Sequence, residues 1–310
     1  MQSNLLVVQN DVVMHRGHNQ LTAVGREQLA KFLVGQSPDP PAYIALGDSL
    51  IDNDTTHLYL QTALVREWHR GLVPSAARQL ISSDVLRLNL DLVGSKAPGQ
   101  FQQLGLFDAA SAPVADVVVS AFDAVGSWVG LTLDNADYTE GSGSLYQAIL
   151  NYVTYWESIF LNTGLSVNAG SHVAANAFLQ LWVKGEIASF NNASYTIFLG
   201  SSGANYYSWT GTLAAEASYS VWRVLRLKLS SATVVGAPNL SALSYFRVYF
   251  TGTGPGAGQF IHLDDARVMT PLQAGVGNLW AIHELPTLLT KQAKDNIAIV
   301  WYLSASELLR

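Results

Sequence analysis

The sequence predicts a mainly β protein in which an antiparallel β-sandwich is inserted into a discontinuous α+β domain. Residues 121–270 hold 23 of the 32 aromatic residues but only 15 of the 40 charged ones. That middle segment also carries short alternating apolar and polar runs separated by turn residues, which is typical of an all-β sandwich. We therefore expect one domain from residues 1–120 plus 271–310 and a second, the sandwich, from residues 121–270.

The insertion follows from the last strand of the chain. The run NIAIVWYL at residues 296–303 alternates as a strand does. A tail of about 40 residues after a finished sandwich cannot bury much surface alone. We expect this strand to pair with strands of residues 80–119, where VLRLNLDLV and FQQLGLF also alternate.

The N-terminal flank contains a helical pattern. Apolar residues of residues 21–34 recur near helical spacing, and Pro40 and Pro41 then forbid continuation. We expect one amphipathic helix there. Residues 55–70 are compatible with a second helix or with a long irregular arm.

The strands of the middle segment present one apolar and one polar side. In VWRVLRLKLSS, the side chains of Leu225, Leu227 and Leu229 alternate with those of Arg226 and Lys228. We expect the leucines to face the core. The large aromatics Trp182 and Trp222, which belong to such runs, are interpreted as packing residues.

Composition excludes several classes of function. The net charge is −6 and the 17 basic residues are dispersed, so nucleic acid is not an expected partner. The sequence lacks the roughly 20 uninterrupted apolar residues of a spanning helix, and its start lacks a basic region and a cleavage site. We expect a protein without membrane insertion or a signal peptide. It has no cysteine, and therefore no disulfide.

The flanks resemble the N-terminal domain of phage tail-collar fibre and related tail or baseplate proteins. The residues that carry this resemblance are NQLTAVGREQLAKFLVG, YIALGDS, LVREWHR with Leu64, Glu67 and Arg70 spaced Leu-x-x-Glu-x-x-Arg, FQQLGLFDAAS, and LLTKQAKDNIAIVWYLS. Gln103 stands where that family usually has an acidic residue. The resemblance implies a non-enzymatic virion structural protein of a tail fibre or baseplate. Other virion proteins and further copies of this chain are the implied partners, and the alternative is a capsid decoration protein.

The middle segment resembles a jelly roll of the carbohydrate-binding-module type. The resemblance rests on AFDAVGSWVG, YTEGSGSL, FLQLWVKG, VWRVLRLKL and FIHLDDARV. It implies a structural Ca²⁺ held by Asp123, Glu140 and Asp265, an oxygen-only ligand set that suits a hard cation. The alternative is that Asp264 and Asp265 cap a turn and that Glu140 is exposed.

Aromatic residues suggest where a host surface polysaccharide would bind, because sugar rings stack on flat aromatic faces. The run NYYSWT reads as a loop after a strand, where aromatics are less needed for the core. Tyr206, Tyr207 and Trp209 are therefore the predicted carbohydrate platform. The alternative is that they contact a neighbouring subunit, since interfaces are enriched in Tyr and Trp.

A tetrapeptide of one hydrolase class is also present. Gly47-Asp48-Ser49-Leu50 follows a predicted strand, as in GDSL-type esterases. Such enzymes need a histidine general base with a supporting aspartate late in the chain, whereas the single Asp-x-x-His here is Asp54 to His57. We therefore predict no catalytic residues and interpret the tetrapeptide as a turn, with an esterase acting on host glycans as the less favoured alternative.

Overall fold

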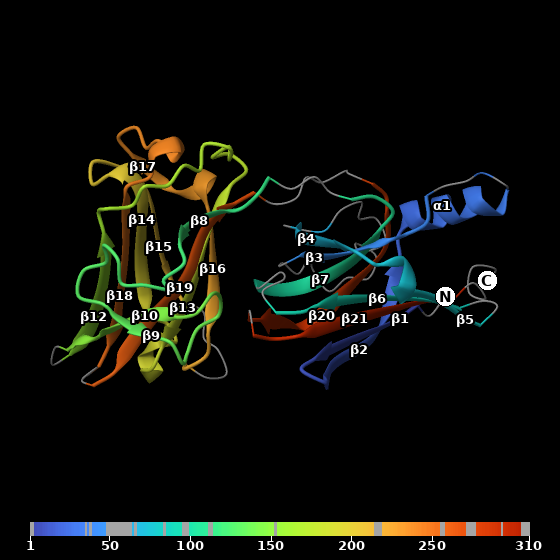
Figure 1. Cartoon of the computed structure of the whole chain (residues 1–310), viewed down its shortest axis with the longest axis horizontal. Coiled ribbons are helices and arrows are strands. Elements are labelled where there is room, and N and C mark those ends of the chain that lie inside the picture. The colour runs from blue at the N-terminus through green and yellow to red at the C-terminus, as the bar shows by residue number, and fades with distance from the viewer. Residues whose placement is uncertain are drawn as a thin grey trace. The chain divides into compact units, whose positions relative to one another are not determined.

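A computed structural model gives the fold of the chain (Figure 1). The residues it describes are 3–34, 36, 39–47, 64, 67–82, 85–94, 99–110, 114–151, 154–213, 219–254, 258–270, 277–292 and 294–304. Strands dominate and every strand pair in these residues is antiparallel, which confirms the predicted fold class. The chain divides into two compact units. Unit 1 is Met1–Pro113 with Pro271–Arg310, and unit 2 is Val114–Thr270.

Unit 1 is built on one nine-stranded sheet with the strand order β4-β3-β7-β20-β2-β1-β21-β6-β5. A single helix, α1 (Ala23–Leu33), and a short 3-10 turn, η1 (Ser75–Ala77), accompany it in the described residues. The strands are β1 (Ser3–Gln9), β2 (Val12–Leu21), β3 (Tyr43–Gly47), β4 (Glu67–Leu72), β5 (Arg78–Ser82), β6 (Val85–Leu92), β7 (Gly99–Phe107), β20 (Leu279–Lys291) and β21 (Ile297–Ser304).

Three expectations for the flanks are confirmed. The predicted helix is α1, and the alternating runs at residues 85–93 and 101–107 are β6 and β7. The closing strand β21 pairs with β6 along its length and with β1 on its other side. Its side chains Ile297, Ile299 and Trp301 are buried in the core of unit 1. The tail is therefore stabilised by strands that lie more than 200 residues earlier in the chain.

The expectation of a helix or arm at residues 55–70 is wrong for its final part. Glu67–Leu72 is strand β4, which pairs with β3 from Tyr43↔Leu72 to Gly47↔Glu67. Tertiary pairing satisfies the backbone N–H and C=O groups of this segment, and it outweighs the weak local preference for helix. The remainder of the range lies outside the described residues, apart from Leu64, which is buried.

Residues of the LVREWHR and FQQLGLFDAAS segments take part in two polar clusters of unit 1. Arg70 donates to Glu67 through Nε at 2.6 Å and Nη2 at 2.7 Å, and its guanidinium lies 3.6 Å from the centre of the Phe107 ring. Asp108 accepts hydrogen bonds from the backbone and side chain of Asn278, both at 2.7 Å. These motif residues hold segments of unit 1 together.

The departure at Gln103 has a local explanation. Gln103 is fully buried and donates through Nε2 to Glu284 Oε1 at 2.7 Å. An acidic residue at this position would place two carboxylates side by side, which is costly in a buried site. The amide therefore suits the glutamate that this chain has on β20.

Unit 2 is a sandwich of two sheets. Sheet C has the order β16-β13-β19-β10-β9, with β8 also pairing with β19, and sheet D has the order β11-β12-β18-β14-β15-β17. The strands of sheet C are β8 (Val117–Ser120), β9 (Thr132–Asp134), β10 (Ser144–Ala148), β13 (Phe178–Gly185), β16 (Arg223–Lys228) and β19 (Phe260–Met269). Those of sheet D are β11 (Leu150–Asn151), β12 (Tyr155–Asn162), β14 (Ser194–Ser202), β15 (Asn205–Thr212), β17 (Thr233–Val235) and β18 (Tyr245–Thr253). Three 3-10 turns, Ala188–Phe190, Leu229–Ser231 and Leu240–Ala242, join them.

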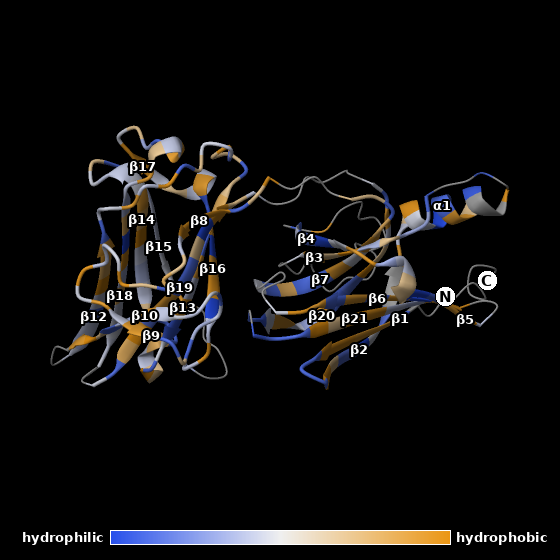
Figure 2. Ribbon diagram, viewed as in Figure 1, coloured by the Kyte–Doolittle hydropathy of each residue, from blue (hydrophilic) through white to orange (hydrophobic). Residues whose placement is uncertain are grey.

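The core of unit 2 lies between the two sheets. It is formed by alternate residues of the strands, and Figure 2 shows apolar and polar residues alternating along many of them. Leu227 and Leu229 are buried in this core and Leu225 packs against it, which confirms the predicted face. Trp182 and Trp222 are buried, as expected of packing residues, but outside this core, since Trp182 lies on the opposite face of β13 from Leu181 and Val183. No helix in the described part of the chain has the length and apolar character to cross a membrane.

Candidate functional site

Two of the three predicted platform residues belong to the core. Asn205–Thr212 is strand β15 and not a loop. Tyr207 and Trp209 are 8% and 6% exposed and belong to the core between the sheets, where Trp209 Nε1 donates to Lys228 O at 2.7 Å. Their assignment to a carbohydrate platform is therefore wrong. The run alternates, and alternation along a strand sends every second side chain inward.

Tyr206 lies on the opposite, outward face of the same strand. It pairs with Gly200 of β14, which in turn pairs with Tyr245 of β18. Outward aromatic side chains of neighbouring strands extend the surface around it. Together they form what we call the aromatic face: Tyr155, Phe198, Tyr206, Tyr245, Arg247 and Tyr249.

Close ring packing makes part of the aromatic face continuous. The Tyr206 ring centre is 5.2 Å from that of Phe198 and 6.3 Å from that of Tyr245. Gly200 lies between the two tyrosines, and an added Cβ there would come 2.1 Å from Asn205 O. A side chain at this position is therefore excluded, and the rings on either side can approach each other.

Polar groups are interleaved with these rings. The Arg247 guanidinium lies 5.5 Å from the Phe198 ring centre and 6.0 Å from that of Tyr249. Tyr249 donates through its hydroxyl to Glu157 Oε2 at 2.7 Å. Burial, with the adjacent Glu157 carboxylate, raises the pKa of Tyr249 to about 12. The phenol therefore stays protonated and can serve as a hydrogen-bonding group at physiological pH.

The aromatic face suits an uncharged ligand rich in hydroxyl groups. Aromatic rings offer flat apolar surface, and a guanidinium or a carboxylate can hydrogen-bond to hydroxyls. All members named above are partly exposed, with Tyr155 at 43%. Phe198, Tyr245, Arg247 and Tyr249 were not predicted from the sequence. The available signal was Tyr-x-Arg-x-Tyr in YFRVYF, where the residues opposite the apolar positions are aromatic instead of small and polar.

The predicted calcium ligands lie in an acidic cluster of unit 2 that also contains an arginine. Asp265 is 1% exposed and accepts hydrogen bonds from Arg267 Nε at 2.9 Å and Nη2 at 2.5 Å. Asp123 accepts from the backbone N–H of Ser142 at 2.5 Å, and its charge acts on Asp265. The charge of Glu140 acts on Arg267. Of the three residues, only Asp265 contacts the guanidinium.

The residues suit a divalent cation in chemistry but do not form a ligand sphere. Carboxylate oxygens are the ligands that Ca²⁺ prefers, and six to eight are needed. Arg267 already neutralises part of the cluster, and in the described residues no three His, Asp or Glu side chains are placed to hold one metal ion. Calcium at Asp123, Glu140 and Asp265 stays a prediction.

Calcium binding here would be detected as thermal stabilisation. At a Ca²⁺ concentration about a hundred times its Kd we expect roughly 2.7 kcal/mol of added stability, a rise in Tm of roughly 5–10 °C by calorimetry. Asp265→Asn should abolish the rise, whereas Asp91→Asn, at an exposed position of β6, should retain it. The same Tm in Ca²⁺ and in EDTA would contradict the site.

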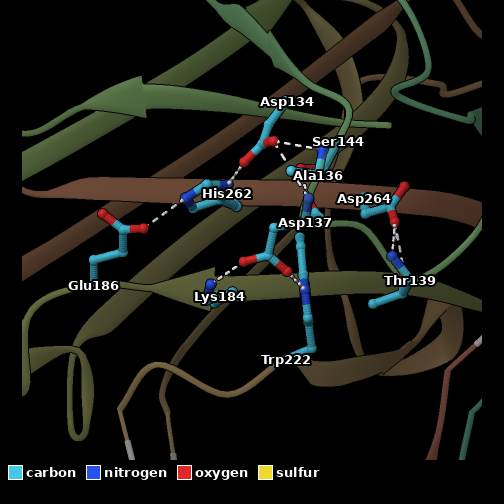
Figure 3. Close-up of polar contacts among 10 residues, drawn as sticks. All are labelled: Asp134, Ala136, Asp137, Thr139, Ser144, Lys184, Glu186, Trp222, His262 and Asp264. Atoms are coloured by element: carbon cyan, nitrogen blue, oxygen red, sulfur yellow. Dashed lines mark hydrogen bonds and ion pairs between the residues drawn. The ribbon is translucent and has the colours of Figure 1, made fainter. Parts of the chain in front are cut away.

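Asp264, beside this cluster, is a buried carboxyl group with an altered pKa. It accepts through Oδ2 from Thr139 N at 2.5 Å and Thr139 Oγ1 at 2.8 Å (Figure 3), and from Glu140 N at 3.0 Å. Burial raises the pKa of Asp264 to about 7 in spite of these hydrogen bonds. The backbone of Asp265 is left-handed (φ 40°) where the pairing of β19 with β13 shifts register. The resulting bulge buries two successive aspartates.

This pKa predicts how stability depends on pH. Between about pH 4 and 7 the folded chain holds a proton on Asp264 that the unfolded chain has lost. Stability should therefore fall as pH rises through this range, by at most about 1.4 kcal/mol per pH unit, and this contribution should level off above it. Tm measured against pH should fall less steeply in Asp264→Asn, which keeps an acceptor oxygen, than in Asp91→Asn. Equal slopes in the two variants would contradict the assignment.

The esterase-type tetrapeptide is described only at its first residue. Gly47 ends β3, whereas Asp48, Ser49 and Leu50, together with Asp54 and His57, lie outside the described residues.

Comparisons with known proteins find similarity in three-dimensional structure alone. No model of a known protein family matches the chain, and no curated protein matches its sequence. Among solved structures, a family 11 carbohydrate-binding module from Clostridium thermocellum in complex with a β-1,3-1,4-mixed-linked tetrasaccharide is 13% identical, with 52% of this chain and 99% of that one covered at a TM-score of 0.33. A family 30 carbohydrate-binding module of a cellulosomal cellulase of Clostridium thermocellum is 14% identical, with 58% of this chain and 98% of that one covered at a TM-score of 0.30. TmCBM61 in complex with β-1,4-galactotriose is 10% identical, with 47% of this chain and 89% of that one covered at a TM-score of 0.27.

Proposed function

We propose that unit 2 is a non-catalytic carbohydrate-binding module that binds a neutral polysaccharide on its aromatic face. The observation that carries this proposal is the outward Tyr206–Phe198–Tyr245 cluster with Arg247 and Tyr249 beside it. Large aromatics on the outer side of a sheet are not needed for the core between the sheets. Rings interleaved with hydrogen-bonding groups are instead what a pyranose chain requires.

Binding would combine stacking with hydrogen bonds to hydroxyl groups. Sugar rings would lie against Tyr206 and Tyr245, and vicinal hydroxyls would accept from Arg247 and donate to Glu157. Because the rings pack against each other in the free protein, little side-chain entropy would be lost on binding. A single face of this kind gives modest affinity, which several linked copies would raise.

The test is a polysaccharide screen with the full chain, followed by calorimetry on the glycan that binds. Tyr206→Ala and Arg247→Ala should each weaken binding about tenfold or more, as expected when roughly 1.4 kcal/mol of contact is lost. The matched control is Tyr219→Ala, at a tyrosine that is 39% exposed and outside the aromatic face. If the two face variants instead change the oligomeric state in light scattering and no glycan binds, the face is a subunit contact and the proposal fails.

We further propose that this module is carried by a virion protein of a phage tail fibre or baseplate, with unit 1 holding it in the particle. The support is the resemblance of the flanks to tail-collar proteins and the burial of Glu67 and Arg70, two of the motif residues, in one ion pair. Immunogold labelling of purified particles with an antibody against residues 121–270 is expected to mark the tail. Label over the head would indicate a capsid decoration protein, and unlabelled particles would exclude a virion role.

A further inference from the structure

Unit 2 has a recess on sheet C, whereas the aromatic face belongs to sheet D. It has a volume of about 560 Å³, within the range of small-ligand pockets, and its lining includes Asp134, Tyr146, Glu186, Phe260 and His262. Strand pairing brings these residues together, because Tyr146 of β10 stands opposite His262 of β19. We call this recess the acidic pocket.

One wall of the acidic pocket is aromatic. The Tyr146 ring centre lies 5.0 Å from that of Phe260, edge to face, and 5.3 Å from that of His262. Tyr146 and Phe260 are both partly exposed. They offer an apolar surface, and their π faces attract cations.

Two carboxylates flank the imidazole of this pocket. Glu186 Oε1 lies 3.3 Å from His262 Nε2, and Asp134 Oδ2 lies 3.9 Å from His262 Nδ1 (Figure 3). His262 is 3% exposed, and its Nδ1 forms no hydrogen bond to any described residue. Burial, then the charge of Lys184, lower the pKa of His262. The imidazole therefore does not neutralise the two carboxylates at neutral pH.

The nearby cation is already paired. Lys184 donates to Asp137 Oδ2, and Asp137 Oδ1 accepts from Trp222 Nε1 at 2.7 Å (Figure 3). Burial raises the pKa of Asp137, but the hydrogen bonds from Lys184 and Trp222 outweigh it and hold that pKa below its ordinary value. Asp137 and Lys184 thus cancel each other, and Asp134 and Glu186 leave the pocket with an excess of negative charge.

We propose that the acidic pocket binds an amino sugar, with the ammonium group of the sugar at the carboxylates of Asp134 and Glu186, which lie on opposite sides of the His262 imidazole, and with its ring against Tyr146 and Phe260. The carboxylates supply charge-assisted hydrogen bonds, and the imidazole of His262, whose Nδ1 forms no hydrogen bond to a described residue, lies between them. The volume exceeds what an alkylammonium group alone would fill, and the aromatic wall suits a pyranose ring. This site is separate from the aromatic face, and its ligand differs in charge from a neutral glycan.

The probes are glucosamine oligosaccharides and their fully N-acetylated counterparts, titrated calorimetrically into the full chain. The amine form should bind and weaken as salt is raised, whereas the N-acetylated form, which has no charge, should bind at least tenfold more weakly. Glu186→Gln and Asp134→Asn should each weaken amine binding about tenfold. The matched control is Glu27→Gln on α1, where the side chain is 62% exposed, and it should bind as the unchanged protein does.

Three outcomes would overturn the proposal: equal binding of the amine and N-acetylated forms, no effect of Glu186→Gln, or spermidine binding as tightly as the amino sugar. The last would show a general polyamine site. Tyr206→Ala separates this proposal from the preceding one, because it should remove binding of the neutral glycan and leave amine binding intact.

Discussion

Replacing Arg70 with Met is expected to destabilise unit 1 by about 3–5 kcal/mol, because it leaves a buried carboxylate without its partner. The side chains of Arg70 and Glu67 are 1% and 3% exposed. Burial raises the pKa of Glu67, and the hydrogen bond from Arg70 and its charge oppose that rise. Without Arg70, the carboxyl would be driven towards its neutral form. Urea unfolding of the full chain should show the loss, and it should be smaller at pH 5 than at pH 8.

The matched control is the exposed ion pair of α1. Lys31 Nζ lies 2.6 Å from Glu27 Oε1, but the two side chains are 40% and 62% exposed. Exposed pairs of this spacing contribute a few tenths of a kcal/mol. Lys31→Met should therefore change stability by less than about 0.5 kcal/mol. If Arg70→Met were as stable as Lys31→Met, the buried network would not be what holds the motif segments of unit 1.

Replacing Trp209 with Ala is expected to destabilise unit 2 by about 3–5 kcal/mol, as for other large-to-small changes in a core. Trp209 is 6% exposed and lies in the core of the sandwich, with its ring centre 6.4 Å from that of Tyr207. The substitution removes this packing and the hydrogen bond to Lys228 O, which keeps the hydrogen bond from Ser231 Oγ. Denaturant unfolding monitored by far-UV circular dichroism would measure the change.

Tyr206→Ala on the same strand is the control, and it separates the two faces of β15. Tyr206 is partly exposed and packs on Phe198 across the strand pair, so its loss should cost about 1 kcal/mol or less. We expect this variant to lose glycan binding while the chain stays folded, and Trp209→Ala to bind normally in proportion to its folded fraction. If Trp209→Ala abolished glycan binding by the folded protein and Tyr206→Ala left it unchanged, the glycan would bind at Trp209 and not at Tyr206.

These two residues also illustrate the limit of sequence-based interpretation for the site. Tyr206, Tyr207 and Trp209 form one cluster in the sequence, which predicts one surface. Once the segment is a strand, neighbours such as Tyr206 and Tyr207 point to opposite sides. Gly, Ser and Asn around the segment favour a loop, whereas the structure pairs it with the adjacent strand β14 and with β17, which lies about 20 residues further along the chain.

The acidic pocket could not be found from the sequence, because its residues come from distant strands. Tyr146, Glu186 and His262 are separated by 40 residues or more, and no motif links them. Their proximity depends on β10 and the end of β13 both pairing with β19. The Glu67–Arg70 pair is different, since its spacing was visible in the sequence and only its burial was not.

The sequence by itself determined where β3, β6, β7 and β21 of the flanks and β16 of the middle segment lie, because alternation of apolar and polar side chains is a local property. It also determined helix α1, through apolar spacing and the two prolines that follow. The tertiary structure decided which aromatic rings are core and which form the aromatic face, because a shift of one residue in a strand exchanges its two faces. It also decided which charges are paired, since burial and the approach of distant strands set those energies.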